Sequence, residues 1–317
     1  TLFPSLSNQN TRVYPDKEWF LKKMLTGIPE NWPNRSFSRN IQTGDLSWHV
    51  QIAGNSPAHI LLLHGTGSSA HTWGNLFTEL AKNYTVIAPD LPGHGFTKNH
   101  GKKDLNLEAL AEKLSELRAA LKIEYFDHII GHSAGATLAL SYTLKNKQAK
   151  TIVGLNPSLI SLPSFYHKFV APFLNPIVTS SFFTAVLSDL LPHTKMIDSL
   201  IDSTNTKLDV EKRERYKTLF KNAHHLNGSM SFMAGTDIPG LLEQCSQIKS
   251  QLTFILTEDD GWIPAPALRQ VIQKSFNQAK MIEIKGGHMF HEGNEKLALE
   301  LIKEALHEQG GSHVHSS

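Results

Sequence analysis

The chain has 317 residues, of which 40% are hydrophobic and 19% are charged, and its formal net charge is +2 at pH 7. These values are typical of a folded globular protein and exclude a disordered chain. The near-neutral charge gives no reason to expect nucleic acid as a partner. The single cysteine, Cys245, excludes an internal disulfide framework, and the first residues lack the pattern of a signal peptide. We therefore expect a cytoplasmic protein.

Short apolar stretches alternate with helical patterns along most of the chain. Residues 1–40 form a polar lead-in, in which Asp16 to Leu25 is expected to form a short amphipathic helix. The predicted strands are Leu46–Ile52, His59–Leu63, Thr85–Ala88, His128–Ile130, Thr151–Leu155, Leu252–Leu256 and Met281–Ile284. The predicted helices are Trp73–Lys82, Leu107–Leu121, Ser133–Lys145, Pro264–Phe276 and Asn294–Glu308. This alternation predicts an α/β fold with a mostly parallel central sheet and helices on both faces.

One long stretch, from Pro157 to about Asn227, breaks the alternation. It contains no convincing strand, only helix-like segments rich in Phe, Leu and Ile. An insertion of this length between two sheet strands is best explained as a helical cap over the strand ends. The core domain is accordingly expected to comprise residues 41–156 and 228–309, followed by a flexible tail at 310–317.

The segment Phe169–Ser188 within this insertion has no charged residue and is long enough to suggest a membrane span. Pro172, Pro176 and the polar run Thr179-Ser180-Ser181 interrupt it, so we do not expect it to span a membrane. We expect the apolar wall of a substrate pocket with some affinity for a membrane surface. The pocket residues predicted here are Phe169, Phe173, Phe182 and Phe183.

The sequence Gly131-His132-Ser133-Ala134-Gly135 lies between a predicted strand and a predicted helix. In this context Gly-x-Ser-x-Gly is typical of a nucleophile elbow, in which the glycines let strand and helix approach closely. The elbow would expose Ser133 at the positive end of a helix dipole. A Gly/Ser-rich turn without a catalytic role can have the same five-residue pattern, so the rest of the sequence must distinguish between the two interpretations.

Four other predicted strands are also followed directly by chemically reactive or glycine-rich residues. Ligands of an open parallel sheet bind outside the carboxyl ends of its strands, so these segments are expected to meet at one edge. The five segments are His64-Gly65-Thr66-Gly67, Asp90-Leu91-Pro92-Gly93-His94-Gly95, Ser133, Glu258-Asp259-Asp260 and Gly286-Gly287-His288. Five such coincidences favour the elbow reading.

A serine nucleophile needs a base, and the base needs a carboxylate that orients it. The order serine, acid, histidine along the chain predicts Ser133, Asp260 and His288 as the catalytic residues. Asp259 competes for the role of acid, with Glu258 as the weaker alternative. His291 is the alternative base, although its flanking residues suggest the start of the last helix.

Acyl transfer develops negative charge on an oxygen, which two backbone N–H groups usually stabilise. Ala134, directly after the serine, and Thr66, in the loop after an early strand, are the predicted donors. Gly65, His132 and Trp262 lie beside these residues in the sequence and are expected to line the substrate pocket. The remaining histidines lack the spacing of a metal site, so we predict neither metal nor cofactor. They include His224, His225, His313 and His315.

Together these motifs resemble the α/β-hydrolase superfamily over about residues 46–308. The finer pattern resembles the magnesium-chelatase accessory hydrolases found with bacteriochlorophyll biosynthesis. The stretches that carry this resemblance are Trp32–Ser36, Leu46–Gln51, Leu61–Trp73, Ala88–Thr97, Gly131–Ala136 and Ile152–Asn156. It implies a role near magnesium insertion into a porphyrin without naming a substrate. The chain has no phosphate-binding Gly-x-x-x-x-Gly-Lys-Ser/Thr loop, which a chelatase motor would need.

The leading hypothesis is a serine hydrolase that cleaves an ester or related acyl bond of a small molecule with an apolar part. An alternative is a non-catalytic accessory protein that binds a hydrophobic ligand such as a tetrapyrrole. A C–C bond hydrolase or a perhydrolase on the same scaffold is a further alternative. Members that cleave haloalkanes or epoxides use an aspartate nucleophile, so Ser133 argues against those reactions. The oligomeric state is left open.

Overall fold

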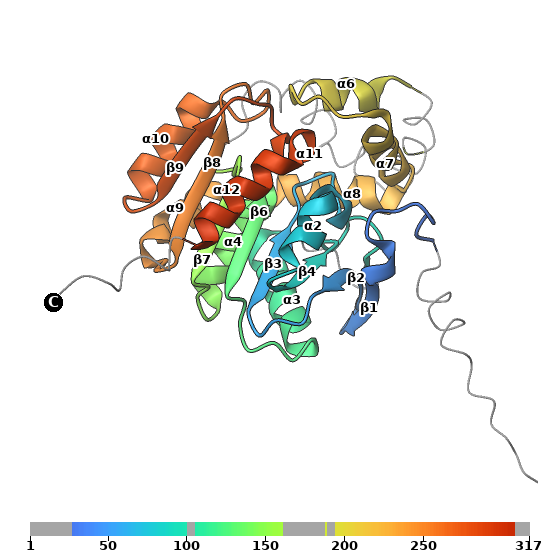
Figure 1. Cartoon of the computed structure of the whole chain (residues 1–317), viewed down its shortest axis with the longest axis horizontal. Helices are drawn as coiled ribbons and strands as arrows, with labels where there is room; N and C mark the ends of the chain where they lie inside the picture. The colour runs from blue at the N-terminus through green and yellow to red at the C-terminus, as the bar shows by residue number, and fades with distance from the viewer. Residues whose placement is uncertain (1–26, 100–104, 161–187, 189–193, 308–317) are drawn as a thin grey trace, which may run out of the picture.

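Figure 1 shows a computed structural model of the chain, which describes residues 27–99, 105–160, 188 and 194–307. The predicted helix Asp16–Leu25, the four pocket phenylalanines and the tail at 310–317 lie outside these residues.

Within the described residues the strands form one nine-stranded sheet in the order β1-β2-β4-β3-β6-β7-β8-β9, with β5 paired to β2. The strands are β1 Ser38–Thr43, β2 Leu46–Ala53, β3 His59–Leu63, β4 Thr85–Pro89, β5 Lys98–Asn99, β6 His128–His132, β7 Thr151–Leu155, β8 Gln251–Thr257 and β9 Lys280–Ile284. Pairing is parallel from β4 to β9 and antiparallel around β2. The predicted α/β fold with a mostly parallel sheet is confirmed.

The sheet is buried on both faces because its central strands are apolar along their whole length. In β3, for example, Ile60 and Leu62 face one core cluster while Leu61 and Leu63 face the other. The first cluster, with Leu62, contains residues of α2 Gly74–Leu80 and α12 Glu295–His307. The second contains residues of α3 Leu107–Ala120, α4 Ala134–Lys145, α9 Ile238–Gln244 and α10 Ala265–Ser275. Helices therefore cover both faces, as the pattern predicts.

All seven predicted strands are present, with ends that differ by at most two residues. The edge strand β1 is not predicted, because its sequence, Ser-Arg-Asn-Ile-Gln-Thr, is polar and largely solvent-facing. The predicted helix Trp73–Lys82 corresponds to α2, which is directly preceded by a 3₁₀ turn, η2 Ala70–Trp73. Helix α9 is not predicted. His291 lies in a separate short helix, α11 Phe290–Gly293, and not at the start of α12 as expected.

The described part of the predicted insertion, from Pro157 to Asn227, holds helices and no strand. We call this segment the helical insertion. Its helices are α6 Met196–Asp202, α7 Val210–Phe220 and the start of α8 Ala223–Ala234, and α6 and α7 lie at the upper right of Figure 1. The predicted boundary between the insertion and the core, after Asn227, falls within α8. This helix continues past Asn227, and its Phe232 packs into the core. No helix in the described ranges is both long and apolar enough to cross a membrane.

Candidate active site

The turn between β6 and α4 holds Ser133 in a conformation that side chains rarely adopt, with φ 52° and ψ −121°. The two glycines of this turn are required because neighbouring backbone atoms leave no room for a Cβ at either position. A Cβ on Gly131 would lie 2.5 Å from the Cα of Ala136, and a Cβ on Gly135 would lie 2.2 Å from the carbonyl oxygen of Leu63. The turn therefore has the geometry expected of a nucleophile elbow.

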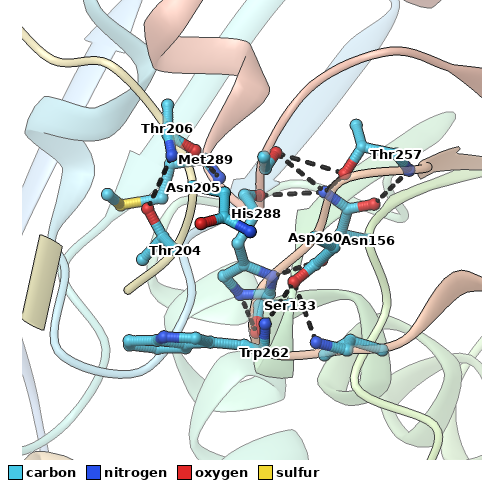
Figure 2. A network of polar contacts seen from close by, with 12 residues as sticks. Ser133, Asn156, Thr204, Asn205, Thr206, Thr257, Asp260, Trp262, His288 and Met289 are labelled. Carbon is cyan, nitrogen blue, oxygen red and sulfur yellow. Dashed lines mark hydrogen bonds and ion pairs between the residues drawn. The ribbon is translucent and has the colours of Figure 1, made fainter. Parts of the chain in front are cut away.

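Ser133, His288 and Asp260 form a chain of hydrogen bonds, although they come from distant parts of the sequence (Figure 2). His288 Nδ1 lies 2.7 Å from Asp260 Oδ2, and His288 Nε2 lies 3.0 Å from Ser133 Oγ. All three side chains are buried. A carboxylate can only accept, so Nδ1 donates to Asp260 and a neutral His288 has Nε2 free to accept the Ser133 proton.

Of the three acidic residues after β8, only Asp260 is brought to His288. The second oxygen of Asp260, Oδ1, accepts hydrogen bonds from the backbone N–H groups of Trp262 at 2.7 Å and Ile263 at 2.8 Å. These bonds leave Oδ2 for the imidazole and fix the direction in which the carboxylate points. Asp259 and Glu258 are solvent-exposed, and Glu258 pairs with Lys285 instead.

The backbone around His288 is held by two side chains that donate to its carbonyl oxygen. These donors are His132 Nε2 at 2.9 Å and Asn156 Nδ2 at 3.0 Å. Asn156, directly after β7, also accepts a bond of 2.8 Å from the backbone N–H of Thr257 at the end of β8. Sequence reasoning gave Asn156 no role, and its position after a strand was the only available signal.

His291, the alternative base, is not in contact with Ser133. Its ring packs at a centroid distance of 4.3 Å on that of His132, and its Nε2 lies 2.8 Å from Thr72 Oγ1. Burial lowers the pKa of His291 to about 3. Burial, together with the neighbouring His291 and His288, also lowers the pKa of His132 well below its ordinary value. Both rings are therefore neutral near pH 7.

The loop that carries Thr66 packs directly on the elbow. A Cβ on Gly65 would lie 3.1 Å from the Cβ of Ser133, which is tighter than an ordinary contact, so a glycine eases this close approach. Ala134 is the first residue of α4, where N–H groups have no acceptor within the helix. Thr66 lines the same cavity as Ser133. The structure thus brings both predicted oxyanion donors to the neighbourhood of the serine.

Asp90, in the loop after β4, is hydrogen-bonded to the segment that follows the Thr66 loop. Its carboxylate accepts from the backbone N–H groups of Ala70 at 2.7 Å and Phe96 at 2.8 Å, and it contacts His49 Nδ1 at 2.7 Å. Burial alone would raise the pKa of Asp90, but His49 and these bonds stabilise the charged form and hold the pKa well below its ordinary value. His64 Nε2 accepts from the N–H of Leu91 at 2.9 Å, and its Nδ1 donates to the carbonyl oxygen of Gly65 at 2.8 Å.

A cavity of about 500 Å³ opens over Ser133 and His288. Of the predicted pocket residues in the described ranges, His132 and Trp262 line this cavity and Gly65 does not. Its wall is mostly apolar, and half of the lining residues come from the helical insertion, including Ile197, Leu200, Ile201, Phe220 and Leu226. Trp262 also stacks on the ring of His288, with centroids 5.1 Å apart and planes 30° apart.

Behind this cavity a buried carboxylate, Glu292, joins the insertion to the core. Tyr216 of α7 and Thr72 of the core both donate hydrogen bonds to its Oε1, the latter at 2.5 Å. Lys212 of α7 donates to the Glu292 carbonyl oxygen at 2.5 Å and to Glu295 at 2.7 Å. Burial raises the pKa of Glu292 to about 7. No local pattern in the sequence predicts this cluster.

Among the residues that the structure describes, no group of three or more His, Cys, Asp or Glu side chains could hold a metal ion. The histidines that were given no functional role from the sequence differ in burial. His225 is fully buried, with Nδ1 accepting from the N–H of Gly95 at 3.0 Å, whereas His224 is partly exposed. His313 and His315 lie outside the described ranges.

Known proteins resemble this chain in sequence and in structure. The model of the alpha/beta hydrolase family matches residues 60–300. The magnesium-chelatase 30 kDa subunit of Rhodobacter capsulatus is 30% identical over 275 residues, which cover 84% of this chain and 93% of that protein. This similarity confirms the predicted resemblance to the magnesium-chelatase accessory branch.

Two solved structures show the same fold at low sequence identity. The enol-lactonase from Burkholderia xenovorans has a TM-score of 0.67 and 17% identity, with 85% of this chain and all of that chain (100%) covered. A hydrolase from Pseudomonas aeruginosa has a TM-score of 0.66 and 20% identity, with 85% of this chain and 98% of that chain covered. The chain belongs to the alpha/beta hydrolase family.

Proposed function

We propose that this protein is a serine hydrolase that cleaves an ester or related acyl bond of a substrate with an apolar part. One observation carries the proposal: His288 lies within hydrogen-bond distance of both Ser133 Oγ and Asp260 Oδ2, and the cavity opens over the elbow that carries Ser133. Such an arrangement activates an otherwise weak nucleophile.

In the first half of the reaction, Ser133 Oγ attacks the acyl carbon while His288 Nε2 takes its proton. Asp260 stabilises the imidazolium that forms, and the N–H groups of Thr66 and Ala134 would stabilise the oxyanion. His288 then returns the proton to the leaving oxygen as the ester bond breaks. In the second half, His288 takes a proton from water, the water oxygen attacks the acyl-enzyme, and Ser133 Oγ leaves with that proton.

The cavity supports an apolar substrate of moderate size. Its volume of about 500 Å³ lies within the range of pockets that take small molecules, and its predominantly apolar wall includes Met, Leu, Ile and Phe side chains. The similarity to a protein named as a magnesium-chelatase subunit supports a role accessory to magnesium-porphyrin synthesis. The four phenylalanines predicted from the sequence remain proposed members of this wall.

Labelling with a fluorophosphonate probe tests the proposal, with the modified residue located by mass spectrometry. We expect modification at Ser133, and competition by esters with longer apolar chains. The Ser133→Ala protein should fold normally and lose p-nitrophenyl ester turnover by several orders of magnitude. Unchanged turnover in that variant would refute the proposal. A C–C hydrolase or a perhydrolase would also be labelled, and product analysis would identify it.

A binding or accessory role is the second candidate, favoured by the ready-made apolar cavity and by the name of the relative from Rhodobacter capsulatus. In this case the cavity would hold a hydrophobic ligand such as a tetrapyrrole, and Ser133 would be dispensable. Complementation of a pigment-synthesis defect separates the two functions. Rescue by Ser133→Ala supports binding, whereas rescue by the unaltered chain alone supports hydrolysis.

A further inference from the structure

The turn that follows α6, Ser203–Thr206, lies against the two loops that carry the acid and the base. We call these four residues the insertion turn. Figure 2 shows Thr204, Asn205 and Thr206 beside His288, with a dashed line from Thr206 to Met289. Each of the turn's four residues contacts one of the two loops, although about 50 to 85 residues of the chain lie between the insertion turn and these loops.

The first set of contacts holds the loop of the base. Thr204 accepts at its carbonyl oxygen from the N–H of His288 at 2.8 Å, and Thr206 Oγ1 accepts from the N–H of Met289 at 2.9 Å. A Cβ on Gly287 would lie 2.3 Å from the backbone carbon of Asn205. The two backbones therefore approach more closely than any side chain at position 287 would allow.

The second set of contacts holds the loop of the acid. Asn205 Nδ2 donates to the carbonyl oxygen of Asp259 at 2.8 Å, next to the acid itself. Ser203 Oγ accepts from the indole N–H of Trp262 at 2.9 Å, and this indole stacks on the ring of His288. A Cβ on Gly261 would lie only 2.0 Å from the carbonyl oxygen of Ser203.

The insertion turn is itself held in one conformation by local bonds. Thr204 Oγ1 donates to the carbonyl oxygen of Ile201 at 2.6 Å and accepts from the N–H of Thr206 at 3.2 Å. Asn205 has φ 56°, which Asn and Gly tolerate best. Thr204 and Thr206 are buried. The turn is therefore a fixed support and not a loose surface loop.

We propose that the insertion turn is a positioning element: it sets the distance and angle between Asp260 and His288, and thereby the reactivity of Ser133. The proposal rests on the hydrolase function proposed above. A displacement of about 1 Å at a reacting group can lower a rate by about 10²-fold. Ser203, Thr204 and Met289 also line the cavity, so the wall that meets the substrate is continuous with the support of the base.

Two substitutions remove single contacts from the turn without touching the acid, the base or the serine. Thr206→Val keeps the shape of the side chain but removes the acceptor for Met289. Asn205→Gly keeps the left-handed backbone but removes the donor to Asp259. Each has a matched control. Thr218→Val removes a hydroxyl that bonds only within α7, and Asn34→Gly removes an amide that donates to the Gly74 carbonyl oxygen from the same backbone conformation.

With p-nitrophenyl butyrate as the probe, we expect Thr206→Val and Asn205→Gly to lower kcat by roughly 10- to 100-fold with little change in KM. Both controls should keep the kcat of the unaltered protein. Thermal unfolding of all four variants measures whether a loss of kcat comes from a loss of the folded state. Equal kcat in the turn variants and in the controls would overturn the proposal.

A spectroscopic measurement separates this proposal from the hydrolase function. The His288 Nδ1 proton that is shared with Asp260 should give a low-field proton resonance, identified by its absence in His288→Gln. In Thr206→Val and Asn205→Gly we expect this resonance to broaden through exchange with water, whether or not the protein turns over an ester. An unaltered resonance in both variants, or no such resonance in the unaltered protein, would refute positioning by the turn. A missing fluorophosphonate label on Ser133 would instead refute the hydrolase.

Discussion

Replacing Glu292 by glutamine is expected to stabilise the fold, and to do so only at neutral and alkaline pH. The carboxyl group is buried, and its hydrogen bonds from Tyr216 and Thr72 both go to one oxygen, Oε1. A glutamine can accept the same two bonds at its own Oε1. The substitution therefore removes a buried charge and keeps the hydrogen bonds of the cluster.

The size of the effect follows from the pKa of this group. Burial raises the pKa of Glu292 from the ordinary 4.5 to about 7, so folding takes up a proton between these pH values. At ~1.4 kcal/mol for each pH unit, the charged carboxylate costs the native state on the order of 3 kcal/mol above pH 7. Below pH 4.5 the group is neutral in both states and costs nothing. Stability from this group is therefore present at low pH and lost as pH rises to 7.

Urea unfolding of the unaltered protein and of Glu292→Gln between pH 4.5 and 8.5 measures this effect, because other titrating groups cancel in the difference. We expect the two free energies of unfolding to agree within about 1 kcal/mol at pH 4.5 and to differ by about 2–3 kcal/mol at pH 8. Glu300→Gln, an exposed site on α12, should show a small difference at every pH. A difference for Glu292→Gln that is flat or largest at low pH would refute the reasoning.

Four further substitutions test the geometry of the site. Asp260→Asn should lower ester kcat on the order of 10³- to 10⁴-fold, whereas Asp259→Asn should leave it within about two-fold; equal losses would mean that the acid is wrongly assigned. Gly135→Ala should prevent the elbow from closing and sharply lower the yield of folded protein, since its Cβ would lie 2.2 Å from a carbonyl oxygen of β3. Asn156→Gly keeps the positive φ but frees the His288 carbonyl oxygen from one of its two donors. We expect a loss of about 1–3 kcal/mol in unfolding free energy, and an unchanged urea midpoint would contradict it.

The central sheet could be predicted from the sequence because its strands are buried on both faces and therefore apolar throughout. Thr151–Leu155, for example, is buried at every position and was predicted with its observed ends. Strand β1 shows the opposite case. It lies at the edge of the sheet, pairs only with β2, and exposes most of its side chains, so nothing in Ser38–Thr43 distinguishes it from a polar loop.

The three residues of the hydrogen-bonded chain could be predicted because each follows a strand of the parallel sheet closely. Topology alone then brings Ser133, Asp260 and His288 to the same edge. The residues that hold them could not be predicted in this way. Tyr216 meets Glu292 across 76 positions, and Asn205 meets Asp259 across 54. Such contacts depend on how the helical insertion docks, and no periodicity or motif within it encodes the docking.

The pair Gly286-Gly287 shows what a sequence motif leaves undecided. Before a candidate base, two glycines suggest a loop that must bend, and Gly286 fits this reading with φ 145°. Gly287 does not adopt a positive φ; it is needed because the insertion turn packs on its Cα, where Asn205 leaves no room for a Cβ. The first glycine shapes the loop of His288, and the second allows a segment more than 80 residues earlier in the chain to hold that loop in place. The same residue type therefore serves a local conformation at one position and a long-range contact at the next, and only the second ties the base to the wall of the cavity.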